Sequence, residues 1–469
     1  MLLLKIAFRN ILRNRRRSAL TTSAVAVGAA AMLMFGSFIT FIFEGFQTSV
    51  VQQIGHLTVF HKGYFLFGAG NATAYGIDNY KEVMSAIAND PVLQPLINVV
   101  TPTQIIAGIA GNFEGGNDAA KTFFGFGLLP RDRDRMRQWN EFGAGRVFPN
   151  DSRLSQDDET RGLVGVGLAR ILALCDALKI ENCPSPPAAT QTGGNAHRLP
   201  RRNDVLELAG REGTDKAGES GQLPRLDLLS ATANGAPNVV SLYVAGTDPK
   251  DTKEFDESFV VMHLNLAQKL VYGREEPKAT SIVIQLKRSE YMERARSRLA
   301  ELLKARHADL EIRDFIERSP FYGQALQLFR SLFLFIAAIM GVIVLFSIIN
   351  TMTINVMERT SEIGTIRAMG ARRRIIRRQF LAEGSLLGAI GATAGLLLAT
   401  LVTLMVNHAG LSWIPPGNVS PNPLRLDLSG NLGLVVGTWI GLTLVATLAT
   451  LIPAQRAARL PVVDALRHV

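Results

Sequence analysis

Residues 331–354 read SLFLFIAAIMGVIVLFSIINTMTI, a run of 24 residues without one charged side chain. About 20 apolar residues in a helix cross the hydrocarbon core of a bilayer, which is about 30 Å thick. Three further windows share this property: Leu20–Phe43, Gly384–Val406 and Leu432–Ile452. One such window could be a buried core helix or, near the N-terminus, a signal peptide, but the apolar region of a signal peptide has only about 7–15 residues. Four uncharged windows of this length predict four transmembrane helices.

The basic residues concentrate beside these windows. Residues 1–43 carry six Lys or Arg and no acid, and residues 372–378 add five arginines, whereas residues 44–330 hold 33 basic and 35 acidic residues. Because cytoplasmic flanks of membrane helices are rich in Lys and Arg, both termini and residues 355–383 are predicted to be cytoplasmic and residues 44–330 periplasmic. The charge is then expected to contact anionic lipid rather than nucleic acid.

The windows divide the chain into an expected 1+3 arrangement of helices in a bacterial inner-membrane protein. The predicted fold class is membrane α-helical, with a large α+β periplasmic domain inserted between helices 1 and 2. The segments in order are 1–19, a cytoplasmic amphipathic helix; 20–43, helix 1; 44–330, the periplasmic domain; 331–354, helix 2; 355–383, a cytoplasmic loop; 384–406, helix 3; 407–431, a periplasmic loop; 432–452, helix 4; and 453–469, a cytoplasmic tail.

Residues 3–17 combine an apolar and a basic stripe at helical spacing. This pattern predicts a basic amphipathic helix at the cytoplasmic surface of the membrane. Its expected interface residues are Leu4, Phe8, Arg9, Ile11, Leu12 and Arg13. A second spacing, small residues four apart, recurs at Gly391 and Gly395 and at Gly437 and Gly441, and it permits close helix approach in lipid.

The large segment shows strands mixed with helices, which is typical of an α+β domain. Strands are predicted over 56–64, 239–245 and 279–287, and an amphipathic helix over 291–307. The glycine-rich stretch 108–127 is expected to be a loop or an irregular hairpin, and 184–224 a flexible insertion. The two cysteines, Cys175 and Cys183, could form a disulfide in an oxidising periplasm or remain two separate thiols.

The sequence contains no recognisable enzyme or metal motif. The nearest approach to a phosphate-binding loop is 115–122, where Ala120 stands in place of the second glycine. His56 and His61 would face opposite sides of one strand and could not chelate together. No ionisable residue lies within the four windows, which argues against an ion-coupled carrier. We therefore predict no catalytic residue, no metal and no directly bound cofactor.

Residues 357–371 read MERTSEIGTIRAMGA and lie between the second and third windows. Glu358 and Glu362 are four apart, and Gly370 is a plausible helix stop. A short polar helix held between two membrane helices would suit docking to a partner. An ordinary loop with cytoplasmic arginines explains the same residues, so the residues alone leave both interpretations open.

Several stretches resemble one family, the ABC-transporter permeases that include MacB-like efflux proteins, FtsX-like proteins and lipoprotein-releasing permeases. Residues 358–371 resemble its coupling-helix signature, and 254–268 resemble the end of its outer domain. The opening AFRNILRNRRR at 7–17 and the ending PAQRAARLPVVDALR at 453–467 are also similar. The resemblance is weak across about 105–235.

The resemblance implies a non-catalytic permease that works with a separate cytoplasmic ABC ATPase, which would hold ATP and Mg. A second permease copy or a paralogue would complete a dimer. The outer domain would divide into a porter-like part, about 45–105 plus 278–320, and an inserted part, about 106–277. The implied ATPase-docking residues are Glu358, Arg359, Glu362, Ile363, Arg367, Met369 and Gly370. Removing the charges of Arg359 and Glu362 together is then expected to uncouple ATP hydrolysis without unfolding the protein.

The resemblance further implies mechanotransmission, in which ATP hydrolysis moves the periplasmic domain through stalks at 44–56 and 320–332. Extraction of a lipoprotein or lipid is the expected activity. The alternatives are MacB-like efflux of a periplasmic substrate and FtsX-like regulation of a periplasmic cell-wall hydrolase. The periplasmic partner would accordingly be a lipoprotein, an adaptor or an enzyme.

Overall fold

The structure is a computed structural model that describes residues 2–13, 15–68, 72–113, 119–143, 151, 153–180, 223–250, 252–306, 309–413, 422–428 and 430–461. The chain forms two compact units. The helical unit comprises Met1–Glu44, Gly323–Trp413 and Pro423–Val469, and the α+β unit comprises Gly45–Tyr322 and Ile414–Asn422. Each unit is described by itself.

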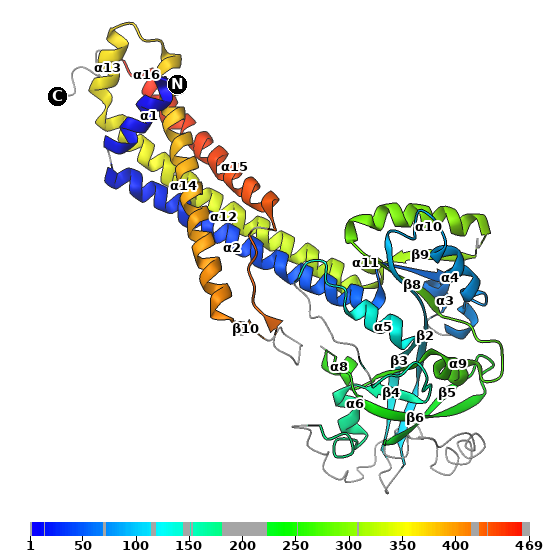
Figure 1. Ribbon diagram of the computed structural model, residues 1–469. Helices are drawn as coiled ribbons and strands as arrows, with labels where there is room; N and C mark the ends of the chain where they lie inside the picture. Colours follow the sequence, from blue (N-terminus) through cyan, green and yellow to red (C-terminus); the bar gives the residue numbers. More distant parts are fainter. Residues whose placement is uncertain are drawn as a thin grey trace. The chain divides into compact units, whose positions relative to one another are not determined.

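Within the described residues, four helical stretches are long and apolar enough to cross a membrane. They are α2 (Arg15–Ile54), α12 (Pro320–Glu358), α14 (Arg373–Ala409) and the consecutive pair α15 (Leu432–Ala449) and α16 (Leu451–Arg459) (Figure 1). Each contains one of the windows expected from the sequence. The predicted fold class, four apolar helices with an α+β domain, is confirmed. Helices α2 and α12 are each longer than their windows, and each contributes residues to both units.

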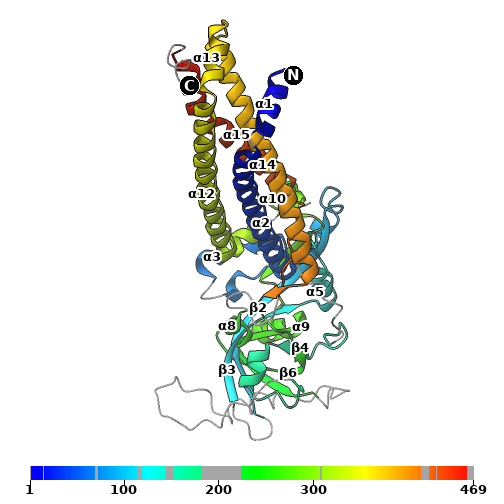
Figure 2. The ribbon, with the colours of Figure 1, turned by 90° about the vertical axis from the view of Figure 1, so that its left-hand side faces the viewer.

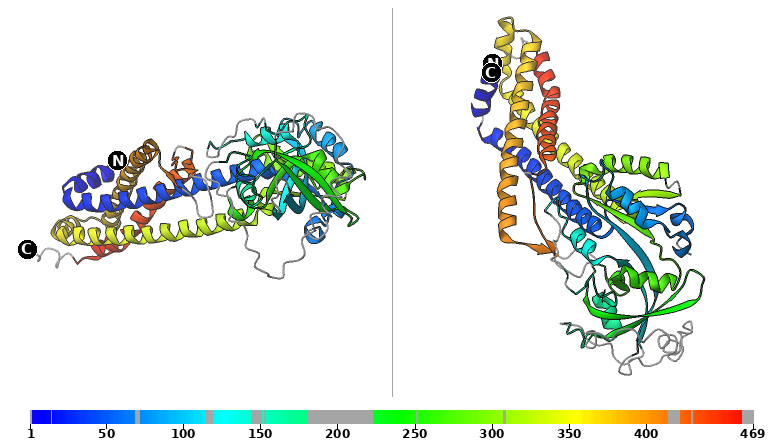
Figure 3. Two further views of the ribbon diagram at one scale, coloured as in Figure 1. Left: turned by 90° about the horizontal axis from the view of Figure 1, so that it is seen from below. Right: turned by 45° about the vertical axis from the view of Figure 1, so that its right-hand side comes forward.

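The core of the helical unit joins α2, α12, α14 and α15 in one apolar cluster. Figure 2 shows α2, α12 and α14 side by side, and the right view of Figure 3 shows α14 (orange) beside α15 (red). Close packing explains two of the four spaced glycines, since a Cβ on Gly395 would lie 2.5 Å from the carbonyl oxygen of Ala26 and one on Gly391 2.6 Å from Val25. Gly437 and Gly441 have no described atom this close.

Short elements complete the helical unit. Helix α1 (Leu2–Arg13) packs against α14, and α13 (Thr360–Ala368) lies between α12 and α14 in the chain. The chain turns after α13 at Gly370, whose φ of +96° lies in the left-handed region that favours glycine. The predicted helix stop is therefore confirmed. Strands β10 (Ser412–Trp413) and β11 (Asn422–Pro423) form a two-stranded sheet between α14 and α15.

The first half of the α+β unit is a split β-α-β sheet. Its elements in chain order are β1 (Leu57–His61), α4 (Tyr80–Ala88), β2 (Ile97–Asn112), β8 (Ser281–Leu286), α10 (Met292–Arg306) and β9 (Leu310–Asp314). The spatial order is β2-β8-β1-β9 with all neighbours antiparallel, which is the ferredoxin-like β-α-β-β-α-β topology. The apolar sides of α4 and α10 pack on the sheet. The strands expected at 56–64 and 279–287 and the helix at 291–307 are confirmed with shorter bounds.

The second half is a six-stranded ring inserted between β2 and β8. It uses the second half of β2 together with β3 (Ala119–Leu128), β7 (Phe259–His263), β4 (Arg161–Val164), β6 (Pro237–Thr247) and β5 (Arg225–Ala231). Each strand pairs with the next in this order, and β5 pairs back with β2, so the ring closes as a small barrel. Helices α6 (Val166–Ile171) and α9 (Leu264–Tyr272) contribute to its core. The strand predicted at 239–245 lies within β6.

The glycine-rich stretch 108–127 was expected to be a loop or an irregular hairpin, and its described residues form the second of these, since they supply most of the antiparallel pairing of β2 and β3. Its glycines permit close approach of neighbouring strands. A Cβ on Gly125 would lie 2.0 Å from the carbonyl oxygen of Val260, and one on Gly108 would lie 2.1 Å from that of Leu229. Glycine inside a strand often marks a bulge, a bend or the close approach of another backbone.

The two largest apolar clusters among the described residues of the α+β unit are separate from each other. One comprises buried residues of 57–96 and 279–310, and the other those of 106–272. These ranges fall on either side of the boundaries expected near 105 and 278. The remaining short elements are α3 (Tyr64–Phe67), η1 (Ala72–Tyr75), α5 (Pro130–Arg137), α8 (Lys253–Asp256), η3 (Ser289–Tyr291) and α11 (Phe315–Arg318).

Two expectations, the insertion at 184–224 and the possible disulfide of Cys175 and Cys183, involve residues outside the described part of the chain. Most of the predicted insertion lies outside it. Cys175 is buried, with 3 % of its surface exposed, and is disulfide-bonded. Cys183, the other cysteine of the sequence, is not among the described residues.

Candidate functional site

The segment expected to contact a partner begins where α12 ends. Helix α12 stops at Glu358, Arg359 leaves the helical conformation with φ −107° and ψ 18°, and α13 begins at Thr360. Glu358 and Glu362 therefore belong to two successive helices rather than to one continuous helix. The break at Arg359 turns this side chain toward α14.

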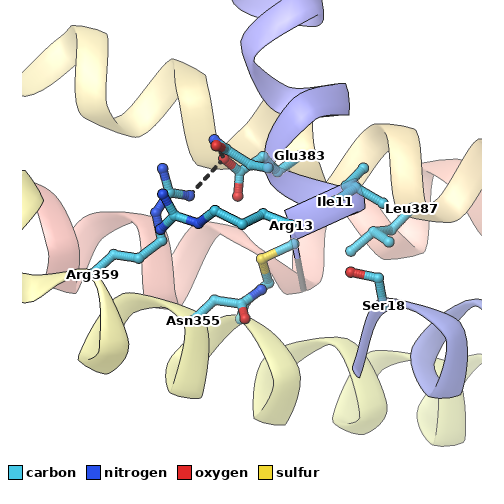
Figure 4. Close-up of a pocket in the computed structure, with 9 residues that line it drawn as sticks. Ile11, Arg13, Ser18, Asn355, Arg359, Glu383 and Leu387 are labelled. Carbon is cyan, nitrogen blue, oxygen red and sulfur yellow. Dashed lines mark hydrogen bonds and ion pairs between the residues drawn. The ribbon is translucent and has the colours of Figure 1, made fainter. Parts of the chain in front are cut away.

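A buried ion pair fixes this junction. The Nη1 atom of Arg359 lies 3.1 Å from Oε1 of Glu383, and the amide Nδ2 of Asn10 donates to the same oxygen at 2.5 Å. Glu383 is 3 % exposed. Figure 4 shows the ion pair in a small pocket between α1, α12 and α14, with Asn355 on its wall. One buried carboxylate thus joins α1, the α12–α13 junction and α14.

A second layer of ion pairs lies at the surface. Nη2 of Arg13 lies 2.7 Å from Oε1 of Glu362, and Arg17 pairs with Glu358. Burial acts to raise the pKa of Glu362, but hydrogen bonds from Arg13 and Arg359 outweigh it and hold the pKa below its usual value. These outer side chains are 42–56 % exposed, so each outer pair contributes little to stability.

The residues predicted to dock an ATPase separate into two groups. Arg359, Ile363 and Arg367 contact the chain itself, since Ile363 is 4 % exposed and Arg367 donates to the carbonyl oxygen of Leu460. Met369 is 75 % exposed and Gly370 is also at the surface. Docking by the exposed members stays a prediction.

Sequence reasoning missed Glu383 because this residue falls one position before the third apolar window. The available signal was its isolation, since it is the only acid between Glu362 and Asp427. An acid beside a membrane helix is expected to pair with a basic residue. The basic residue that pairs with Glu383 is Arg359, which is also one of the predicted ATPase-docking residues.

The predicted interface residues of α1 lie in two different environments. Ala7 is fully buried, and Ile11 packs against the apolar cluster of the helical unit. Phe8 and Leu12 are 51 % and 47 % exposed, and Arg9 is exposed. The side chain of Leu4 is outside the described set. The apolar stripe therefore serves both internal packing and an exposed surface.

The α+β unit contains a tightly bonded joint at the end of α2. Nε2 of Gln285 donates to the carbonyl oxygens of Val51, at 3.2 Å, and of Met136, at 3.0 Å. Gln52 donates to the carbonyl oxygen of Trp139, at 2.8 Å. These hydrogen bonds hold together the last turn of α2, strand β8, and the chain from the end of α5 to Trp139. The α2 residues among them lie within the range 44–56 that was expected to act as a stalk.

His56 and Trp139 form the centre of this joint. Their rings meet edge to face at 5.0 Å between centroids. The backbone N–H of Leu286 donates to Nδ1 of His56, so Nε2 carries the ring proton and donates to the hydroxyl of Ser289. Complete burial lowers the pKa of His56 to about 3, which keeps the ring neutral.

A cluster of buried charges connects α5 to the chain after β6. Asp248 accepts from Nη2 of Arg133 at 2.9 Å and from Nζ of Lys250 at 2.8 Å, and Arg137 lies 3.5 Å away. Burial acts to raise the pKa of Asp248, but Lys250, Arg133 and Arg137 outweigh it and bring the pKa to about 2. With its carboxylate surrounded by three cations, the cluster is a structural element rather than a metal or catalytic site.

Asp248→Asn is expected to destabilise the α+β unit by about 2 kcal/mol at neutral pH, because a pKa lowered from 3.8 to about 2 favours the folded state at about 1.4 kcal/mol per unit. The depressed pKa makes this contribution fully present above the unfolded value and lost as pH falls through about 2. Melting temperatures of both proteins should therefore converge in that interval. The exposed Asp157→Asn serves as control, and a gap that stays constant down to the lowest pH contradicts the assignment.

Comparison with known proteins finds a family match within the helical unit. Residues 334–462 match the family model described as FtsX-like permease C-terminal. This range includes α13, Arg359 and Glu383. The helical unit therefore carries an FtsX-like permease C-terminal domain.

The similar proteins cover only part of either chain. The macrolide export ATP-binding/permease protein MacB of Neisseria gonorrhoeae is 32 % identical over 235 residues, which is 48 % of this chain and 33 % of that protein. The uncharacterized ABC transporter permease YvrN of Bacillus subtilis is 28 % identical over 255 residues, or 51 % of this chain and 57 % of that protein. The chain thus spans about a third of this MacB relative. The crystal structure of the periplasmic region of MacB from Actinobacillus actinomycetemcomitans aligns with 58 % of this chain and 94 % of its own at 14 % identity, with a TM-score of 0.30.

Proposed function

We propose that this chain is the membrane permease subunit of an ATP-driven ABC complex of the bacterial inner membrane. In this proposal both termini and α13 are cytoplasmic and the α+β unit is periplasmic, as the distribution of Lys and Arg indicates. ATP and Mg would be held by an ABC ATPase outside these 469 residues, and a second permease copy or a paralogue would complete the assembly. The chain itself would be non-catalytic.

The observation that carries the proposal is the way α13 is mounted. Arg359, at the start of α13, is tied to Glu383 of α14 through a buried ion pair, and α12 continues without interruption from Glu358 to Pro320. A displacement of α13 therefore moves two membrane helices together. The exposed surface of α13 and of the residue that follows it, which includes Ser361 and Met369, is available for an ATPase. ATP-driven movement would reach the periplasmic domain through α2 and α12.

Two observations favour different substrates for the proposed complex. Helix α3 exposes Phe65, Leu66 and Phe67 by 45 %, 80 % and 67 %, and such an apolar surface suits the acyl chain of a lipid or lipoprotein. This favours the extraction of lipid or lipoprotein. The name of the Neisseria relative, a macrolide export protein, favours the second candidate, efflux of a periplasmic substrate with an adaptor.

Gentle purification from native membranes with mass spectrometry tests the proposal. We expect an ABC ATPase to accompany the wild-type chain, and Met369→Asp or Ser361→Arg to abolish this association without changing the melting temperature. The matched control is Gln455→Arg, an exposed position of α16. A retained lipoprotein supports extraction, an adaptor supports efflux, and a cell-wall hydrolase supports FtsX-like regulation. Absence of an ATPase after crosslinking, or its full retention by both variants, refutes the docking surface.

A further inference from the structure

The exposed surface of α1 combines apolar and basic side chains. Phe8 and Leu12 are about half exposed, whereas Ala7 on the other side of the helix is fully buried. Arg9 lies beside Phe8, and Arg15 and Arg16 follow at the start of α2; all three arginines are exposed. A helix with large apolar side chains interleaved with arginine on one exposed side is typical of an interfacial membrane helix.

The arginines of the first two helices have two distinct environments. Arg13 and Arg17 are paired with Glu362 and Glu358. Among the described residues, no carboxylate lies within ion-pair distance of Arg9, Arg15 or Arg16. Arg13 and Arg17 are engaged by carboxylates of the chain itself, and the other three arginines are available for an external anion.

A second group of unpaired arginines lies at the start of α14. Arg374, Arg377 and Arg378 are exposed, and they likewise have no carboxylate partner in the described part of the chain. The spacing i, i+3, i+4 places them on one side of the helix, while Ile376 and Phe380 are buried on another. Arg378 precedes Glu383 by about 7.5 Å along the axis at about 1.5 Å per residue. Because Asn10 bonds Glu383, this group lies near the level of α1.

We infer that these two groups form one binding band for the phosphates of anionic phospholipids, with Phe8 and Leu12 inserted among the acyl chains. The band, defined as Arg9, Arg15, Arg16, Arg374, Arg377 and Arg378, immediately precedes the apolar runs of α2 and α14. Chain continuity therefore places it at headgroup level on the side where these spans begin. The negative surface of anionic lipid attracts such arginines electrostatically.

Lipid fits this band better than the acidic surface of a protein. The exposed apolar side chains of α1 need a hydrophobic environment beside the phosphates, which a bilayer supplies along its whole interface. The carboxylates of Glu362 and Glu358 are already paired with Arg13 and Arg17, so the band is not required to neutralise them. This inference requires that the chain span a membrane, but it does not depend on an ATPase.

The first experiment measures retained lipid. The full-length chain is reconstituted in mixed phosphatidylcholine and phosphatidylglycerol, extracted in mild detergent and examined by native mass spectrometry. We expect wild type to retain phosphatidylglycerol preferentially, and R9Q/R15Q/R16Q or R374Q/R377Q/R378Q to lower that retention several-fold. The control R274Q/R294Q/K304Q changes exposed basic residues of the α+β unit and should behave as wild type. Equal retention by all variants overturns the inference, as does loss of a co-purifying protein without loss of lipid.

The second experiment does not depend on the folding of arginine variants. A fluorophore on Leu12→Cys should be quenched by brominated acyl chains in vesicles containing phosphatidylglycerol, and less in phosphatidylcholine alone. The same fluorophore on Ser361→Cys of α13 serves as control and should be quenched in neither. Equal quenching at both positions, or no effect of phosphatidylglycerol at Leu12→Cys, overturns the inference.

Discussion

Replacing Glu383 with leucine is expected to destabilise the helical unit by about 3–5 kcal/mol, because it leaves the guanidinium of Arg359 buried without its partner. The side chain of Arg359 is only 11 % exposed, and Asn10 loses its acceptor in the same variant. We expect a lower melting temperature in detergent and a poor yield of folded protein. Glu383→Gln, which keeps an acceptor for Asn10, should lie between leucine and wild type.

Matched variants separate burial from charge. Glu358→Gln and Glu362→Gln remove acids of the same network, but at positions more than 40 % exposed, and each should cost about 1 kcal/mol or less. The double variant E383L/R359L removes both buried charges and should recover part of the loss, which a double-mutant cycle measures. If Glu383→Leu is no worse than Glu362→Gln, the buried pair does not hold the junction.

The same geometry changes an expectation that the sequence suggested. Removing the charges of Arg359 and Glu362 together was expected to uncouple ATP hydrolysis without unfolding the protein. Arg359 now has a buried carboxylate to neutralise, so its removal would also damage packing. Substitutions at the exposed Met369 and Ser361 are the cleaner test of docking.

The membrane helices of the helical unit could be predicted from the sequence, because hydropathy and charge are properties of each local stretch of chain. An uncharged run such as 331–354 can satisfy its backbone only as a helix in lipid. Which residues meet across helices was less accessible. Gly395 and Gly441 share one spacing pattern, yet only Gly395 has a neighbouring backbone against it. That difference depends on the partner helix.

The α+β unit shows the same limit more strongly. Alternation predicted β1 and β8, because one side of each strand is apolar and packs on helices. The closed ring was not predictable from alternation, since its strands pair over long stretches of chain, as Phe124 of β3 does with Phe259 of β7. The sequence alone does not decide between a loop and an irregular hairpin for the stretch that contains Gly108 and Gly125, because a glycine needed for close strand contact has the same local signal as one needed for a turn.

Replacing Trp139 with alanine is expected to destabilise the α+β unit by about 3–5 kcal/mol, the usual cost of removing a buried large aromatic side chain. The indole is 6 % exposed, contacts the ring of His56 and donates through Nε1 to the carbonyl oxygen of Lys287 at 3.0 Å. Its removal opens a cavity beside the last turn of α2 and leaves that carbonyl unpaired. Amide hydrogen exchange should accelerate first at 51–54 and 136–139.

Trp139→Phe separates packing from hydrogen bonding, because the phenyl ring can still meet His56 while the indole N–H is lost, at a cost of about 1 kcal/mol. A cavity beside His56 also admits water, which weakens the burial that depresses its pKa from 6.5 to about 3. The wild-type ring contributes stability above the unfolded pKa, and this contribution is lost as pH falls toward about 3. In Trp139→Ala the pKa of His56 should rise, so stability should depend less on pH in this interval. An unchanged histidine titration by NMR, or exchange that accelerates only far from α2, would show that Trp139 does not secure the joint through which movement of α2 is expected to reach β8.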